Sequence, residues 1–192
     1  MLLASLGLRV TVVRSSYQEH SLPGLAPAEL ALRHARGKAD AAPPSGALIV
    51  AADTVVDVDG EALGKPRDAA EGRAMLRRLS GRGHLVHTAF ALRDDRTSAR
   101  YDEVVSTGVY FTELSDELIA LYVSGGDGRD KAGGYGIQGF AATLVERIDG
   151  DYFTVVGLPL AAFARALPLV GYVLLPQPIP VPAPRPSAKV PA

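Results

Sequence analysis

The run of apolar residues from Ala47 to Ala52 most limits the folds that are open to this chain. It has the length of a strand and contains no polar position, which is typical of a strand buried on both faces of a sheet. Asp59-Gly60 lies a few residues further on, after a short alternating stretch, and predicts a hairpin turn. Strand-like and helix-like stretches then alternate along the chain. The sequence therefore predicts an α/β fold with a mixed sheet and flanking helices.

Local signals place the other elements. Pro27 is a good first residue for a helix, and Asp68 with Glu71 three residues later resembles a capping box. The expected helices are a short one at the start, then 27–42, 68–79, 115–125 and 158–167. The expected strands besides 47–52 are 10–13, 85–93, 103–111 and 140–148.

Length and composition indicate one domain with a substantial core. A chain of 192 residues can bury about two-thirds of the surface of its unfolded form without a disulfide or metal staple. The absence of cysteine excludes a disulfide framework, a thiolate zinc site and a thiol nucleophile, and it suits a reducing, cytoplasmic setting. The net charge of −1 provides no basic field for nucleic acid. No apolar run reaches the roughly 20 residues that cross a membrane.

Proline divides the chain into a folded part and a tail. Eight of the fourteen prolines lie from Pro168 onward, and proline occupies every second position from Pro176 to Pro186. Alternating proline favours extended polyproline II and removes backbone donors. We therefore expect a folded domain over residues 1–170 and a disordered tail over residues 171–192. The tail is either solvated or a docking segment for another protein.

Four glycines lie within the ten residues from Asp130 to Gly139. Glycine lets a ligand approach the backbone, Lys131 can neutralise an anion, and Gln138 can both donate and accept hydrogen bonds. The glycines also spell G-x-G-x-x-G, but the residues that follow predict a strand rather than the helix that a dinucleotide site requires. The loop is either a site for a phosphorylated small molecule or a glycine-rich turn between two strands.

Two single residues outside this loop are candidates for chemistry. Asp53 follows the apolar run, where open α/β sheets place ligand-binding side chains, although an aspartate there can also form a turn or a cap. Lys65 leaves a rigid Gly-Lys-Pro turn and is either a site residue or a surface lysine. The histidines show no metal-binding pattern, because His84 and His87 would face opposite sides of a strand.

Several motifs occur together along residues 2–167. They are Leu30-Ala31-Leu32 with Lys38, Ala52-Asp53-Thr54-Val55-Val56, Gly64-Lys65-Pro66, Leu79-Ser80-Gly81-Arg82-Gly83-His84, Asp130-Lys131-Ala132-Gly133, Tyr135-Gly136-Ile137-Gln138-Gly139, Val145-Glu146-Arg147-Ile148 and Val155-Val156-Gly157-Leu158-Pro159. In this order they resemble the Maf-type nucleoside triphosphate pyrophosphatases. The resemblance implies a two-lobed fold, related to the inosine triphosphatases, with a central nucleotide cleft.

The resemblance also implies a house-cleaning reaction that converts a nucleoside triphosphate to its monophosphate and pyrophosphate, with magnesium or manganese as cofactor. The implied site residues are Asp53 and Glu19 for catalysis and metal binding, Thr54 and Gln138 for base recognition, and Lys38, Lys65 and Lys131 for phosphate binding. The branch of the family with Ala-Asp-Thr at this point takes dTTP and UTP. Relatives are often dimers, so a homodimer is expected. The alternative for Glu19, whose neighbours resemble the family less than those of Asp53, is a solvated loop acid.

One motif of the family is absent. Its members begin with a strand and a Ser-x-Ser-Pro-Arg-Arg loop, whereas Met1-Leu2-Leu3-Ala4 already resembles the helix that follows that loop. We expect either that the true start of the protein lies upstream, or that this chain lacks the strand and its phosphate loop. In the second case the alternative function is a nucleotide-binding regulator, of the kind that affects septum formation, with weak or no turnover.

Overall fold

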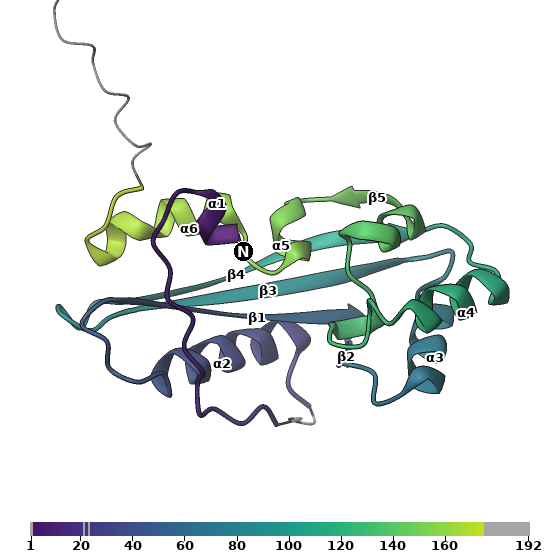
Figure 1. The fold of residues 1–192 in the computed structure, drawn as a ribbon, viewed down its shortest axis with the longest axis horizontal. Helices are drawn as coiled ribbons and strands as arrows, with labels where there is room; N and C mark the ends of the chain where they lie inside the picture. Colours follow the sequence, from purple (N-terminus) through teal and green to yellow (C-terminus); the bar gives the residue numbers. More distant parts are fainter. Residues whose placement is uncertain (1, 21, 23, 175–192) are drawn as a thin grey trace, which may run out of the picture.

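A sheet of five strands in the order β2-β1-β3-β4-β5 forms the centre of the protein (Figure 1). The computed structural model describes residues 2–20, 22 and 24–174. The strands are β1 (Leu48–Val58), β2 (Glu61–Leu63), β3 (Gly83–Asp94), β4 (Arg100–Phe111) and β5 (Val145–Asp149). The predicted α/β fold, a sheet with flanking helices, is confirmed. All four pairs of neighbouring strands are antiparallel, so this sheet does not combine parallel and antiparallel pairs.

Most of the helices begin and end within two residues of the positions that local signals indicate. They are α1 (Leu2–Ser5), α2 (Pro27–Asp40), α3 (Ala69–Leu79), α4 (Asp116–Gly125), α5 (Tyr152–Val156) and α6 (Leu160–Ala166). The Asp68 carboxylate accepts a hydrogen bond from the Glu71 backbone N–H, and Ser115 caps α4 in the same way. Gly126 ends α4 with a φ of 82°, which glycine adopts without strain. Within the described residues, no helix is long and apolar enough to cross a lipid bilayer.

The two faces of the sheet pack against different helices (Figure 1). On one face α2 lies close to β1 and β3 through its buried alanines, Ala31, Ala35 and Ala39. On the other face, β3 contributes Phe90 and Leu92 to a cluster with α6. Because β3 is central and covered on both faces, its burial pattern is nearly continuous rather than alternating.

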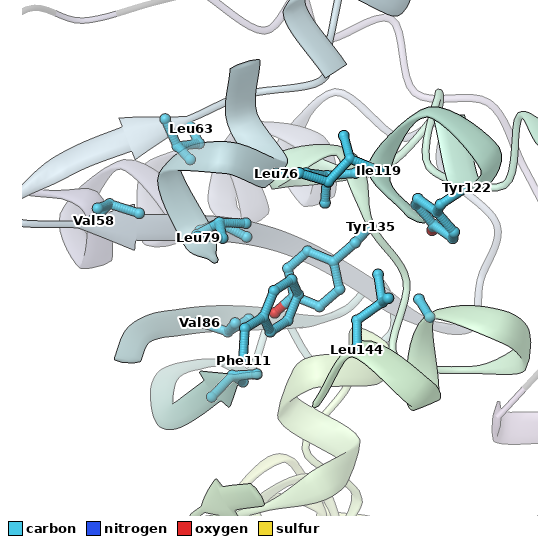
Figure 2. Close-up of a cluster of buried hydrophobic side chains, with 13 residues drawn as sticks. Val58, Leu63, Leu76, Leu79, Val86, Phe111, Ile119, Tyr122, Tyr135 and Leu144 are labelled. Atoms are coloured by element: carbon cyan, nitrogen blue, oxygen red, sulfur yellow. The ribbon is translucent and has the colours of Figure 1, made fainter. Parts of the chain in front are cut away.

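A third cluster fills the end of the sheet beneath α3 and α4 (Figure 2). Leu76 and Leu79 of α3 and Ile119 of α4 meet Phe111 of β4 there. Tyr135 enters the same cluster from the glycine-rich loop, with its ring centroid 4.8 Å from that of Phe111. The buried tyrosine therefore anchors this loop to the core.

Two of the predicted strands differ from the structure, and one helix was not predicted. Residues 10–13 form no strand, and Val12 is 74% exposed. The prediction was wrong because a strand needs a hydrogen-bonded neighbour, which local sequence does not reveal. Residues 139–144 form a 3-10 helix, and only Val145–Asp149 is a strand. The short helix α5 was not predicted, although Asp151 caps it by accepting a hydrogen bond from the Thr154 N–H at 2.7 Å.

Residues 171–174, which follow the expected end of the domain, contact the folded part. The Tyr172 N–H donates to the Leu167 carbonyl, and its hydroxyl donates to Asp94 on the long hairpin of β3 and β4. Leu174 packs against the cluster below α6. The proline-rich stretch from Pro176 to Pro186, which we expect to be disordered, lies outside the described residues.

His84 and His87 face opposite sides of β3, as the sequence predicts. The His87 ring contacts Ser106 and Asp57, whereas His84 Nε2 lies 2.7 Å from the Tyr135 hydroxyl in the core below α3. Burial, with a smaller contribution from Arg82, lowers the pKa of His84 to about 4. The histidine is therefore neutral in the folded protein at neutral pH.

This buried histidine predicts acid sensitivity. Below pH 6.5 His84 becomes protonated in the unfolded chain, whereas in the folded protein it stays neutral until the pH approaches 4. The folded state therefore loses stability as the pH falls through this window, by up to about 3 kcal/mol. Urea unfolding of the wild type and His84→Gln at several pH values measures the effect. The free energy of unfolding of His84→Gln should lose this part of its pH dependence, and that of the exposed control His20→Gln should keep it. If the free energy of unfolding changed equally with pH in the wild type and in His84→Gln, the prediction would be contradicted.

Candidate active site

A cleft of about 480 Å³ wraps around the open edge of β1. Strand β2 pairs only with Val56 to Val58, so among the described strands none covers this edge of β1 before Val56. The cleft is lined by α2, β1, the turn after β2, the glycine-rich loop and α5. All seven residues expected at the site line it, namely Glu19, Lys38, Asp53, Thr54, Lys65, Lys131 and Gln138.

Asp53 lies inside a strand, not at its end. The apolar run was expected to stop at Ala52, but β1 continues to Val58 and Asp53 pairs with Ala89 of β3. The strand continues because the β-branched residues that follow Asp53 also suit a sheet. Consecutive residues of a strand point to opposite faces, so Asp53 and Thr54 reach the cleft on either side of the open edge.

Lys38 joins the two carboxylates expected to act in catalysis. Its Nζ lies 2.5 Å from Oδ1 of Asp53 and 2.7 Å from Oε1 of Glu19. The Asp53 side chain is only 9% exposed, whereas that of Glu19 is 45% exposed at the mouth of the cleft. Glu19 is thus brought to Asp53 by the lysine of α2, rather than standing free in its loop.

The charges in this cluster shift one another's pKa. Burial raises the pKa of the Asp53 carboxyl, although the adjacent Lys38 ammonium acts in the opposite direction. The hydrogen bond from Lys38 lowers the pKa of Glu19. Burial disfavours the charged form of Lys38, but its hydrogen bonds to Asp53 and Glu19 outweigh this and raise its pKa. Asp53 is therefore the carboxylate better suited to accept a proton.

The two other lysines lie on the wall formed by the glycine-rich loop and the turn after β2. The Gly133 N–H donates to the Gly64 carbonyl at 3.0 Å, which fixes the loop beside Lys65. A Cβ atom on Gly133, whose φ is 69°, would lie 3.0 Å from Val56. Lys131 folds back over its own loop, where Nζ lies 2.6 Å from Asp130. It is therefore held at the rim of the cleft.

The glycine-rich loop is not a turn between two strands. It connects α4 to the 3-10 helix at 139–144, and it contains a 3-10 turn of its own at Ala132–Gly134. Gln138 is exposed at the end of this loop and lines the cleft. Its amide can both donate and accept toward a ligand.

Several residues that line the cleft were not predicted as site residues. Leu30 and His34 precede Lys38 by eight and four residues on α2, and this four-residue spacing places all three on one face of the helix. That spacing is the signal that could have revealed them. Val155 and Val156 of α5 also line the cleft, but their distance along the chain gives no local sign of this.

The donor set suits a hard divalent cation bound together with a substrate. In the part of the chain that the structure describes, no three His, Cys, Asp or Glu side chains gather into a metal-binding group. Asp53 and Glu19 nevertheless direct carboxylate oxygens at a single atom, Lys38 Nζ. Magnesium is commonly held by one or two carboxylates, with water and substrate phosphates as its other ligands.

A family model described as Maf-like protein matches residues 1–169. The chain belongs to this family. A protein of Thermus thermophilus is 52% identical over 160 residues, or 83% of each chain, and is named dTTP/UTP pyrophosphatase. Proteins with the same name from Geobacter metallireducens and Symbiobacterium thermophilum are 45% and 47% identical, over 88% and 89% of this chain and 90% and 88% of theirs. The resemblance seen in the sequence motifs is thereby confirmed.

Proposed function

We propose that this protein is a nucleoside triphosphate pyrophosphatase that converts dTTP and UTP to their monophosphates and pyrophosphate. The observation that carries the proposal is the Glu19–Lys38–Asp53 cluster, which lies in a cleft that two further lysines also line. The names of the relatives support the reaction and the substrates. They do not favour the alternative of a regulator without turnover.

The arrangement supports in-line attack of water on the α-phosphorus. Asp53 is the proposed base, because burial raises its pKa and a carboxylate can take the proton of the attacking water. Lys38, Lys65 and Lys131 are proposed to neutralise the phosphates and the leaving pyrophosphate. Catalysis then depends mainly on positioning and on charge neutralisation, because phosphoryl transfer requires little other chemistry from the protein.

The charge balance of the cleft supports a divalent cation as cofactor. Three lysines line the cleft, but three acids, Glu19, Asp53 and Asp130, line it as well. The side chains alone therefore provide no excess of positive charge for a triphosphate. We propose magnesium or manganese as the cofactor: Asp53 and Glu19 would hold the ion, and it would supply this charge and polarise the phosphate.

The products test the proposed reaction. With magnesium or manganese and a panel of nucleotides, the protein should release pyrophosphate from UTP and dTTP, and in ¹⁸O-labelled water the label should enter the monophosphate. Orthophosphate as the sole product, or label in the pyrophosphate, would overturn the proposal. Nucleotide binding without any turnover would favour the regulatory alternative. A homodimer and a cytoplasmic location remain predictions, from the resemblance and from the cysteine-free composition.

A further inference from the structure

We infer that Thr88 is a positioning residue that makes the Thr54 hydroxyl a hydrogen-bond acceptor toward the base, so that the cleft selects bases with a ring N–H, as in uracil and thymine. This inference rests on the proposed function, because it concerns how the same cleft chooses its nucleotide. Thr88 lies on β3 directly opposite Thr54 and does not line the cleft itself.

Three residues form a chain of hydrogen bonds that runs away from the cleft. Oγ1 of Thr54 lies 2.8 Å from Oγ1 of Thr88, and the Thr88 hydroxyl donates to the backbone carbonyl of Thr154 at 2.6 Å. A carbonyl oxygen can only accept, so the single hydroxyl proton of Thr88 is committed to Thr154. Thr88 can then only accept from Thr54. The proton of Thr54 is therefore committed as well, and its oxygen offers only lone pairs to the cleft.

Thr154, at the far end of these hydrogen bonds, is rigidly held. Thr88 and Thr154 are both 0% exposed, so water does not compete for their hydrogen bonds. The Asp151 carboxylate accepts hydrogen bonds from both the N–H and the hydroxyl of Thr154. Asp151 is fixed in turn through its backbone N–H and carbonyl, both of which bond the Thr107 hydroxyl of β4. None of the three threonines titrates, so the polarity of Thr54 does not change with pH.

An acceptor at Thr54 distinguishes the pyrimidines. The N3 position of uracil and thymine carries a hydrogen between two carbonyl groups, whereas N3 of cytosine is an acceptor. The lone pair of cytosine N3 would therefore face a lone pair of the Thr54 oxygen. Two acceptors that face each other without a hydrogen bond weaken binding strongly. Val155 and Val156 are among the apolar residues that line the cleft, and the Gln138 amide can bond a base carbonyl.

Replacing Thr88 by Val tests the inference, because the side chain keeps its shape but loses its hydroxyl. The Thr154 carbonyl keeps a hydrogen bond from the Gly157 N–H at 3.2 Å, which limits the structural cost. The Thr54 proton is then free to point into the cleft and to bond N3 of cytosine. The ratio of kcat/KM for UTP to that for CTP should fall about tenfold, with turnover of CTP retained or raised. Thr88→Ser keeps a hydroxyl and should keep the ratio near that of the wild type.

Ser80→Ala is the control, since it removes a half-buried hydroxyl that accepts from the Leu114 N–H and belongs neither to the cleft lining nor to these hydrogen bonds. Its ratio should equal that of the wild type. An unchanged ratio in Thr88→Val, with both substrates slowed equally, would mean a merely structural role and overturn the inference. If the wild type releases pyrophosphate from no nucleotide, the proposed function is wrong, but the inference about Thr88 can still be tested by binding. The ratio of the dissociation constants for UMP and CMP, which requires no turnover, should then show the same shift, and its absence overturns the inference.

Discussion

Asp53→Asn should lower kcat for UTP by about 1,000-fold, since a positioned general base contributes roughly 10²–10⁴ to a rate. The amide cannot take the proton of the attacking water and is a poor ligand for a divalent cation. Its shape is unchanged, and Lys38 keeps its ion pair with Glu19. The substitution also removes a negative charge that burial disfavours, since the Asp53 side chain is only 9% exposed. We therefore expect the melting temperature to be preserved while the activity is lost.

The matched control is Asp40→Asn on α2. Asp40 forms a surface ion pair with Arg100 and does not line the cleft, so its loss should change turnover by less than about twofold. Release of pyrophosphate and thermal unfolding are measured for both variants. Full activity in Asp53→Asn would remove the central residue of the proposed mechanism.

Lys38→Met should have the second-largest effect. The side chain keeps its length but loses the ammonium that holds Asp53 and Glu19, and we expect kcat/KM for UTP to fall on the order of 100-fold. Without Lys38, the largest influence that offsets burial is lost, and the pKa of Asp53 should rise further. A carboxyl with a higher pKa stays protonated to a higher pH, so the acidic limb of the pH–rate profile should move to higher pH.

Lys65→Met provides the comparison for this prediction. Lys65 lines the cleft, but among the described residues no ion pair joins it to either carboxylate of the cluster. Its loss should raise KM without moving the acidic limb. If Lys38→Met also raised KM alone, with the pH–rate profile unchanged, Lys38 would serve only as a phosphate ligand.

Local sequence was sufficient where a few adjacent residues determine the structure. Asp68 and Ser115 begin helices with their own side chains, and Gly126 ends one. The hairpin at Asp59-Gly60 is also local, since both residues adopt the positive φ that such a turn requires. The strand predicted at Val10 to Val13 was wrong for the opposite reason, because strand formation depends on a partner that is distant in the sequence.

The candidate site was predicted as a set of residues but not as an arrangement. Motif order identified seven of the residues that line the cleft, and the spacing of Lys38 on its helix could have added His34. The contact between Glu19 and Lys38 could not be predicted, because it joins a loop to the far end of a helix. Nor could the role that we infer for Thr88, because a buried threonine in a central strand has no distinctive local pattern.

The sequence by itself determined the fold class, the family and a set of candidate residues that line the cleft, because these depend on patterns and motifs along the chain. The tertiary structure alone decided that β1 has an open edge and that the cleft wraps around it, which places Asp53 and Thr54 on opposite sides of one strand. It also decided that the Thr54 proton is directed away from the cleft. The physical reason is that charge pairing, burial and hydrogen-bond direction depend on residues that meet only when the sheet and its helices pack together.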